Sequence, residues 1–363
     1  MWRTPEVRAE AARLMACFRD AGAIEVEADV LLPADTLLDL YGEDIRARAF
    51  TTADPLRGEQ MLRPDFTVPV VQMHMAEGAE PARYTYAGKV FRRQEEDPDR
   101  ETEYLQVGYE LFDGADPAGA DAEVFARIAG CLQGLPVTAT TGDMGLLIAA
   151  VDGLSTTARR KAALRRHIWR PARFRALLER YSGRAPVPPT RAALLACEGD
   201  PLKGAGKAIG LRTAEEIRDR IAALHEDAAE APLSGEETRL LSAILSLKGP
   251  AEGALKQLRD LAREMASLTP ALDRFEARLE ALAARGIDAG ALEFAGSHGR
   301  ASMEYYDGFV FAFAADARPE LPPVATGGRY DALTGVLGQG NSIPAVGGVI
   351  RPGVTLALRE GGA

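Results

Sequence analysis

The 363-residue sequence predicts an α+β fold in which an antiparallel sheet is flanked by helices and interrupted by a mainly helical region. Residues 84–93 and 104–112 are rich in aromatic and β-branched side chains and flank a polar connection, which is typical of two antiparallel strands. Residues 152–285 are instead rich in Ala, Leu, Arg and Glu, which favours helices. Strand-like patterns return between residues 287 and 350. We therefore expect a core with a helical insertion, divided as residues 1–150 and 286–363 for the core and 151–285 for the insertion.

Composition and charge limit the classes of function. Hydrophobic residues make up 47% and charged residues 26% of the chain, and no apolar run approaches the roughly 20 residues that span a membrane. The N-terminus lacks the apolar segment of a signal peptide. Three cysteines and four histidines lie scattered, so we expect no metal, no cofactor, no membrane association and a reducing, cytoplasmic setting. The net charge of −10 argues against a nucleic-acid partner, because binding phosphates requires a basic surface.

The N-terminal part predicts a helix, a strand and a second helix. Apolar residues recur at helical spacing across residues 5–21, and the glycine that follows is a common helix stop. Residues 24–33 alternate as in a strand and end at a proline. The second helix is expected at residues 68–75, where Asp65 and Thr67 have a simple interpretation as capping residues.

The second strand of the hairpin has two different faces. The odd-numbered residues 105–111 are apolar and form a core face. On the opposite face Gln106 and Glu110 flank Gly108, where a ligand could lie flat against the backbone. Taken alone, the pattern is more simply that of a strand whose polar face meets solvent, because half-exposed strands are common.

The middle of the chain predicts mainly helices. We expect one at residues 121–132 and another from Gly145, with a short strand at residues 137–141 between them. Residues 159–170 form a basic stripe, which is most simply a solvated helix face, with a phosphate or partner contact as the alternative. Further strands are expected at three places, residues 287–295, 305–313 and 343–350.

These motifs together resemble the histidyl-tRNA synthetases, which are class II aminoacyl-tRNA synthetases. The hairpin reads Tyr-x-Gly-x-x-Phe-Arg and then Gln-x-Gly-x-Glu-x-Phe, like the second class II motif in its histidyl form. A Tyr-Tyr-x-Gly-x-Val-Phe run from Tyr305 and a Gly-Gly-Arg-Tyr-Asp run at residues 327–331 resemble the histidyl-specific signatures. The resemblance implies a class II synthetase-like sheet, an active site floored by the hairpin, and a homodimer with residues 24–33 at its interface.

The resemblance also implies a histidine-binding site. In the family, residues matching Gln106 and Glu110 hold the substrate histidine, and the arginine matching Arg92 contacts phosphate and carboxylate groups. Carboxylates could hold the ammonium or imidazolium group, and two tyrosines could frame the ring. The residues that match the amino-acid side of the synthetase site are Asp65, Thr67, Arg92, Gln106, Glu110, Tyr305 and Tyr306.

The residues that the resemblance assigns to ATP chemistry are absent from their positions. Thr102 stands where synthetases carry an ATP-binding arginine, and Ala301 where they carry the arginine that promotes activation. Arg300 comes one residue too early, which in a strand would turn it to the opposite face. The third-motif arginine is matched by Val354, or by Arg351 after realignment. Two or three such losses imply activation slowed on the order of a million-fold, so we expect no catalysis.

Two further departures concern tRNA. The chain ends soon after the third motif, so we expect no C-terminal anticodon-binding domain. Residues 94–103, which meet the acceptor stem in synthetases, carry six acidic residues and one arginine. This loop would repel a nucleic acid.

A synthetase core that keeps histidine recognition but loses ATP chemistry resembles the ATP phosphoribosyltransferase regulatory subunit family. The resemblance implies a non-catalytic protein that assembles with a short-form catalytic subunit into a hetero-oligomer, a hetero-octamer built on homodimers. Such a protein is required for the first step of histidine biosynthesis and mediates feedback inhibition by histidine. Two alternatives stay open: a truncated or specialised histidyl-tRNA synthetase that still activates histidine with ATP, and a paralogue that binds an amino acid for another partner.

Overall fold

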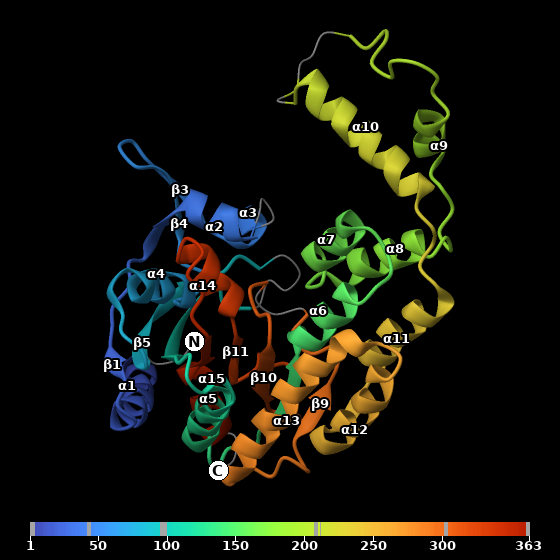
Figure 1. Ribbon diagram of the computed structural model, residues 1–363. Helices are drawn as coiled ribbons and strands as arrows, with labels where there is room; N and C mark the ends of the chain where they lie inside the picture. The colour runs from blue at the N-terminus through green and yellow to red at the C-terminus, as the bar shows by residue number, and fades with distance from the viewer. Residues whose placement is uncertain are drawn as a thin grey trace.

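A nine-stranded sheet forms the centre of the computed structural model, which describes residues 4–41, 45–94, 100–206, 210, 212–300 and 304–360 (Figure 1). Neighbouring strands are antiparallel except in the pairs β1–β5 and β7–β9. This arrangement confirms the predicted α+β fold with an antiparallel sheet. In spatial order the strands are β1 (Ile24–Glu25), β5 (Ala82–Phe91), β6 (Glu103–Phe112), β12 (Ala345–Ile350), β11 (Ala325–Arg329), β10 (Phe309–Ala314), β7 (Thr138–Asp143), β9 (Glu293–Ala295) and β8 (Lys248–Pro250).

Helices cover both faces of the hairpin β5–β6. On one face α1 (Thr4–Asp20) and α15 (Pro352–Glu360) pack against β6, and Phe18 stacks on Tyr109 with ring centroids 5.1 Å apart. On the other face α4 (Thr67–Glu77) contacts α14 (Asp331–Leu337), and His74 stacks on Phe112 at 3.9 Å. The predicted helices at residues 5–21 and 68–75 are therefore confirmed, and each buries one side of the hairpin.

A small second sheet replaces part of the predicted strand at residues 24–33. Only Ile24 and Glu25 pair with β5, whereas β2 (Leu31–Pro33) pairs with β4 (Gly58–Leu62), which also pairs with β3 (Thr51–Asp54). The prediction of one continuous strand is wrong because the two ends of the segment find different partners. Two short helices, α2 (Ala34–Tyr41) and α3 (Ile45–Arg48), lie beside this sheet.

The predicted elements around residues 121–145 are confirmed with shifted ends. The helix α5 (Pro117–Cys131) begins earlier than expected, because Asp116 caps it by accepting from the Gly119 amide at 2.9 Å. The strand β7 and the helix α6 (Met144–Asp152) follow as expected.

Two later strands are shorter than the alternation of the sequence suggests. Of residues 287–295 only β9 is a strand, because the Asp288 side chain accepts from the amides of Gly290 and Ala291 and holds a turn before it. Residues 305–308 precede β10 instead of belonging to it. The two tyrosines of that segment therefore lie before the start of β10 and not within the sheet.

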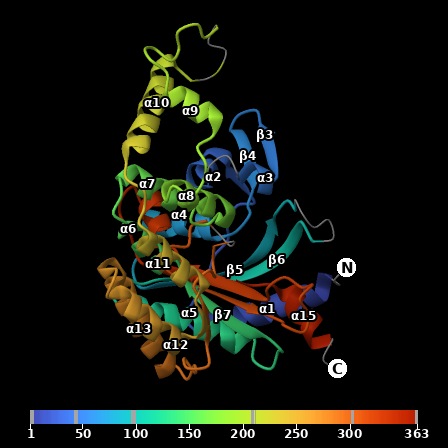
Figure 2. The same cartoon turned by 90° about the vertical axis from the view of Figure 1, so that its right-hand side faces the viewer.

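Helices dominate residues 152–285, as predicted, and α9 and α10 extend away from the sheet (Figures 1 and 2). The strand β8 nevertheless joins the central sheet, and α13 packs on α5. The division into core and insertion remains a prediction. The helices are α7 (Ala158–Arg166), α8 (Pro171–Tyr181), α9 (Pro189–Leu195), α10 (Ala214–Ala229), α11 (Gly235–Ser246), α12 (Ala251–Ala262), the 3₁₀ turn Ala266–Leu268 and α13 (Thr269–Ala284).

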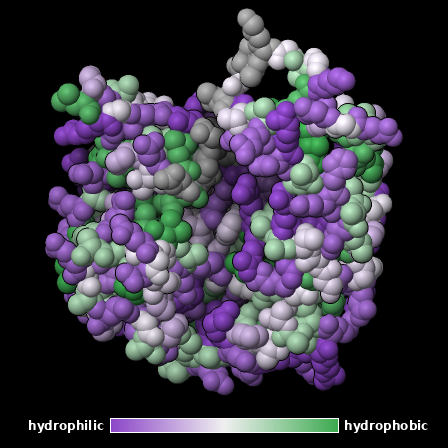
Figure 3. Space-filling model, turned by 45° about the horizontal axis from the view of Figure 1, so that its top comes forward, coloured by the Kyte–Doolittle hydropathy of each residue, from purple (hydrophilic) through white to green (hydrophobic). Residues whose placement is uncertain are grey.

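The molecular surface is hollowed between the side that carries β3, β4 and α2 and the side that carries α7 to α10, and much of this hollow is hydrophilic (Figure 3). Among the described residues, each helix is too short or too polar to cross a membrane.

Candidate functional site

Glu110 is the centre of a buried polar cluster on the face of β6 opposite α1. Its side chain is only 1% exposed. The hydroxyls of Tyr86 and Thr67 donate to Oε1 at 2.8 and 3.1 Å, and the Tyr330 hydroxyl donates to Oε2 at 2.5 Å. Each carboxylate oxygen accepts about two hydrogen bonds, so Oε2 keeps room for one donor from a ligand.

The pKa of Glu110 is raised to about 7, because burial and, to a smaller extent, the nearby Asp65 carboxylate outweigh the three hydroxyl donors, which lower it. Near neutral pH this carboxyl group is therefore poised between its neutral and ionised forms. A cationic group placed at Oε2 would stabilise the ionised form.

Two glycines make the space that Glu110 and Tyr86 occupy. A Cβ atom on Gly347, which pairs with Glu110 across the sheet, would lie 1.5 Å from Oε2 of Glu110. A Cβ atom on Gly108 would lie 2.0 Å from Cζ of Tyr86. Both positions therefore require glycine because side chains of neighbouring strands cross directly above the backbone.

We expect Gly347→Ala to displace the Glu110 carboxylate and to lower the free energy of unfolding by about 1–3 kcal/mol, as overpacking of a core does. Urea denaturation measures this change. The matched control is Gly253→Ala on α12, where an added Cβ meets nothing within 4 Å. The control should be neutral or stabilising by up to about 1 kcal/mol, and equal destabilisation by both variants would contradict the proposed crowding.

Asp65 and Thr67 both lie in this cluster and are both buried. The Val68 amide approaches Oδ1 of Asp65 at 3.5 Å, a long contact, and the N-cap residue of α4 is Phe66 without a side-chain cap. The capping interpretation is therefore wrong for Thr67, because its hydroxyl donates to Glu110 instead. It holds only weakly for Asp65.

Tyr305 and Tyr306 are also buried, and Tyr306 lies near the same carboxylates. Their ring centroids are 5.0 Å apart, and Tyr305 lies 6.0 Å from Tyr330. Burial raises the pKa of Tyr306, as do the charges of Glu110 and Asp65, while Arg92 lowers it. The structure thus brings Tyr306 within electrostatic reach of three other predicted site residues.

Arg92 is half-buried at the end of β5, and its Nε donates to the Pro64 carbonyl at 2.8 Å. Since Pro64 precedes Asp65, this bond ties Arg92 to the segment that carries Asp65, and its charge acts on Tyr306.

Gln106 lies on the same face of β6 as Glu110 but about 13 Å along the strand, by the usual rise per residue. It is completely buried, and within the described structure neither its amide oxygen nor its amide nitrogen has a hydrogen-bond partner. Leaving such a group unpaired costs roughly 1–3 kcal/mol. This cost favours a ligand that pairs with the amide, and burial contradicts the interpretation of Gln106 and Glu110 as a solvated face.

Tyr86 and Tyr330 belong to the site but were not among the predicted residues. Tyr86 could have been found, because it pairs with Gly108 across the hairpin and shares the face of Glu110. Tyr330 lies in the Gly-Gly-Arg-Tyr-Asp run, but only the tertiary fold brings its hydroxyl to Glu110.

Arg300 and Arg351, which lie close in sequence to the positions of the synthetase arginines that act on ATP, have different surroundings. Arg300 donates to the Ile168 carbonyl at 2.8 Å and stacks on Phe174, so it faces the helical region and not Glu110. Arg351 lies over the Tyr104 ring, and burial and the charge of Arg92 lower its pKa. Of the two third-motif alternatives, Arg351 is therefore the one near Arg92, whereas Val354 is buried on α15. Position 301 and residues 95–99 of the acidic loop lie outside the described residues.

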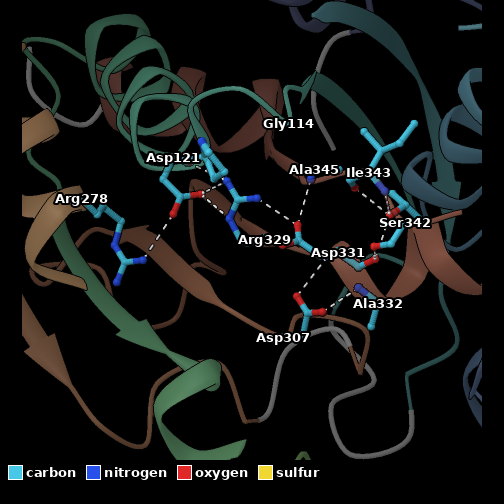
Figure 4. A network of polar contacts seen from close by, with 12 residues as sticks. Gly114, Asp121, Arg278, Asp307, Arg329, Asp331, Ala332, Ser342, Ile343 and Ala345 are labelled. Atoms are coloured by element: carbon cyan, nitrogen blue, oxygen red, sulfur yellow. Dashed lines mark hydrogen bonds and ion pairs between the residues drawn. The ribbon is translucent and has the colours of Figure 1, made fainter. Parts of the chain in front are cut away.

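A buried ionic network supports the segment that carries Tyr330 (Figure 4). Arg329 donates to Asp121 and Asp331 at 2.9 Å each, and Asp121 also contacts Arg278 at 3.3 Å. Asp307 accepts from the amides of Asp331 and Ala332 at the start of α14. The network links α5, α13 and β11, and it holds Tyr330 in place through its neighbours on both sides.

The helical region also contacts the site segment. Trp169, in the turn between α7 and α8, donates from Nε1 to the Tyr306 carbonyl at 3.2 Å, and Arg170 pairs with Glu304 at 3.1 Å. Among the described residues, no group of three or more His, Cys, Asp or Glu is arranged to hold a metal ion. The groups that the site offers to a ligand are carboxylates, hydroxyls, an amide and a guanidinium.

Comparisons with known proteins identify the relatives of this chain. Residues 3–226 and 211–352 match the family described as histidyl-tRNA synthetase. The ATP phosphoribosyltransferase regulatory subunit of Mesorhizobium japonicum is 32% identical over 99% of this chain and 98% of its own length. The protein of the same name from Brucella anthropi is 33% identical over 89% of each chain.

Solved structures share the fold. The crystal structure of an ATP phosphoribosyltransferase regulatory subunit/histidyl-tRNA synthetase from Bacillus halodurans aligns over 99% of this chain and 81% of its own, with a TM-score of 0.69 and 21% identity. A histidine–tRNA ligase subunit from Alicyclobacillus acidocaldarius aligns over 98% of this chain and 93% of its own, with a TM-score of 0.58 and 23% identity. The predicted class II synthetase-like fold is thereby confirmed. With a regulatory-subunit relative matched along its whole length, the chain belongs to the ATP phosphoribosyltransferase regulatory subunit family, which is built on the histidyl-tRNA synthetase fold.

Proposed function

We propose that this chain is the non-catalytic regulatory subunit of an ATP phosphoribosyltransferase, required for the first step of histidine biosynthesis, and that it mediates feedback inhibition by histidine. The relatives are named as regulatory subunits, which is consistent with catalysis residing in another chain. The proposed partner is a short-form catalytic subunit, joined in a hetero-octamer built on homodimers of this chain.

Histidine is the proposed ligand of the Glu110 site. The observation that carries this assignment is the buried amide of Gln106, whose two polar atoms have no partner, on the same strand face as a carboxylate with one open acceptor position. Glu110 and Asp65 would hold a cationic nitrogen of the ligand, and Arg92 its α-carboxylate. Hydrogen bonds to charged groups contribute roughly 1.5–3 kcal/mol each, so a few of them supply micromolar affinity.

Inhibition requires that histidine prefer one arrangement of the complex over another, since a ligand with equal affinity for both shifts nothing. Trp169 and Arg170 contact the segment that carries Tyr306. Through these contacts, a shift of that segment on histidine binding would reach the helical region.

The test is to mix this chain with a short-form ATP phosphoribosyltransferase catalytic subunit and to measure phosphoribosyl transfer with and without histidine. We expect the chain to be required for full activity and histidine to inhibit the mixture. We expect Glu110→Ala to retain activation but lose inhibition. Activity that does not depend on this chain would overturn the regulatory role, and undiminished inhibition in the variant would overturn the site.

Arg351 lies within electrostatic reach of Arg92, which favours one alternative, a specialised synthetase that activates histidine with ATP. Histidine-dependent exchange of pyrophosphate into ATP distinguishes the two functions. We expect no exchange. A partner other than the catalytic subunit in a pull-down would instead support a paralogue that binds an amino acid for another protein.

A further inference from the structure

A cleft of about 580 Å³ lies within the helical region, lined by residues other than those of the Glu110 site. Its walls come from α7, α8, α9, the end of α10 and the loop of residues 183–188. This volume falls within the range of about 300–1,000 Å³ that is usual for small-molecule sites.

The charge of the cleft is opposite to that of the chain as a whole. Its lining includes four arginines but only two carboxylates, whereas the whole chain has a net charge of −10. A positive cleft in an acidic protein raises the local concentration of anions. The charged residues of the lining are Arg160, Arg173, Arg180, Arg191, Asp227 and Glu230.

Two of the arginines share a single carboxylate. Arg160, which is buried, and Arg191 each donate to Asp227 at 2.6 Å. Burial works against the ionisation of Asp227, but the hydrogen bonds from these arginines outweigh it and lower its pKa. The basic stripe predicted as a solvated face is therefore partly internal, since Arg160 ties α7 to α10. One negative charge divided between two guanidinium groups leaves a positive excess at the back of the cleft.

Arg180 is exposed, its guanidinium stacks on an aromatic ring, and its charge also acts on Asp227 without a direct contact in the described structure. Its guanidinium lies 4.6 Å from the Tyr181 ring centroid and donates to the Tyr181 hydroxyl at 2.9 Å, and Arg160 lies 4.9 Å from the same ring. Within the described residues Arg180 makes no ion pair. Stacking orients the guanidinium and leaves some of its N–H donors directed to solvent. This orientation suits bidentate hydrogen bonding to a phosphate.

The remaining wall is apolar. Leu177 and Tyr181 line it from α8, and Val187, between two prolines, lines it from the loop and is 57% exposed. A ligand that fills the cleft therefore meets cationic groups on one side and an aromatic and aliphatic surface on the other.

We propose that this cleft binds a phosphate-bearing small molecule, with the phosphate on Arg180 and Arg173 and a planar or apolar part against Tyr181, Leu177 and Val187. His167 also lines the cleft and belongs to the same turn as Trp169, which donates to Tyr306. The turn between α7 and α8 thus contacts both this cleft and the Glu110 site.

The test is calorimetric titration of the full chain with three probes: AMP, inorganic pyrophosphate and citrate. We expect saturable binding of AMP and pyrophosphate that weakens with added salt. We expect the double variant Arg173→Gln/Arg180→Gln to bind each at least about tenfold more weakly, a loss of roughly 1.4 kcal/mol. Tighter binding of AMP than of pyrophosphate would support the role of the apolar wall.

The matched control is Arg175→Gln, an exposed arginine on the same helix that does not line the cleft. It should bind within about twofold of the wild type, as surface substitutions usually do. Both substituted arginines are exposed, so an unchanged melting temperature of the double variant verifies its fold. Absence of saturable binding at ligand concentrations up to about 10 mM would overturn the proposal, because a dissociation constant above that value corresponds to very weak binding. So would equal weakening by Arg175→Gln, wild-type binding by the double variant, or citrate binding as tightly as pyrophosphate.

Discussion

Replacing Glu110 by alanine is expected to abolish the stabilisation of this protein by histidine. At about 100 times its dissociation constant, histidine should raise the free energy of unfolding of the wild type by roughly 2.7 kcal/mol. The substitution removes the carboxylate that would hold a cationic nitrogen, and it leaves the hydroxyls of Thr67, Tyr86 and Tyr330 without their acceptor. Thermal denaturation with and without histidine measures the effect.

The matched control for this experiment is Glu101→Ala, which removes an exposed carboxylate at the loop end of the same hairpin. It should keep the full histidine-induced shift. If Glu110→Ala responds to histidine as the wild type does, the site has been assigned to the wrong residues.

The same carboxyl group should make both stability and binding depend on pH. Its pKa is raised from 4.5 to about 7 in the folded state, so the native protein holds its proton more tightly than the unfolded chain does. The free energy of unfolding should therefore fall as pH rises between about 4.5 and 7, by at most about 3 kcal/mol, and this part should disappear in Glu110→Gln. Because the α-ammonium of histidine stays charged in this range and pairs with the ionised form, the histidine-induced shift should be larger at about pH 8 than at about pH 6. A shift that is the same at both pH values in the wild type would contradict this linkage.

Arg329→Met is expected to destabilise the fold strongly. Arg329 donates to Asp121, Asp331 and the Pro117 carbonyl, all at 2.7–2.9 Å, and it is buried (Figure 4). Removing one partner of a buried ionic group leaves uncompensated charge, which usually costs about 3–5 kcal/mol. Urea denaturation should show this loss, and histidine binding should weaken because Tyr330 is the next residue.

Arg318→Met serves as the control, since Arg318 forms an exposed ion pair with Glu320 and should change stability by no more than about 0.5 kcal/mol. Arg329→Lys should also be destabilised, because a single ammonium group cannot replace a guanidinium that donates to two carboxylates and a carbonyl. Equal stability losses in Arg329→Met and Arg318→Met would show that the network contributes little.

The errors in the predicted elements have a common cause. The alternation of residues 24–33 and 287–295 is real, but a strand also needs a neighbour, and the neighbours are distant in sequence. Ile24 and Glu25 pair with β5 whereas Leu31–Pro33 pair with β4, and the turn at Asp288 delays β9. Likewise Tyr305 and Tyr306 precede β10, although they continue its aromatic pattern.

The amino-acid order alone determined the hairpin, its glycine-spaced polar face and the helices on either side, because periods of 2.0 and 3.6 residues are local properties of the backbone. It also identified the seven proposed ligand contacts through resemblance. Only the tertiary structure decided that the polar face is buried, that Tyr86, Thr67 and Tyr330 converge on Glu110, and that Gln106 is left without a partner. Burial and hydrogen bonding depend on which segments pack together, and a residue's own neighbours in the chain do not specify that.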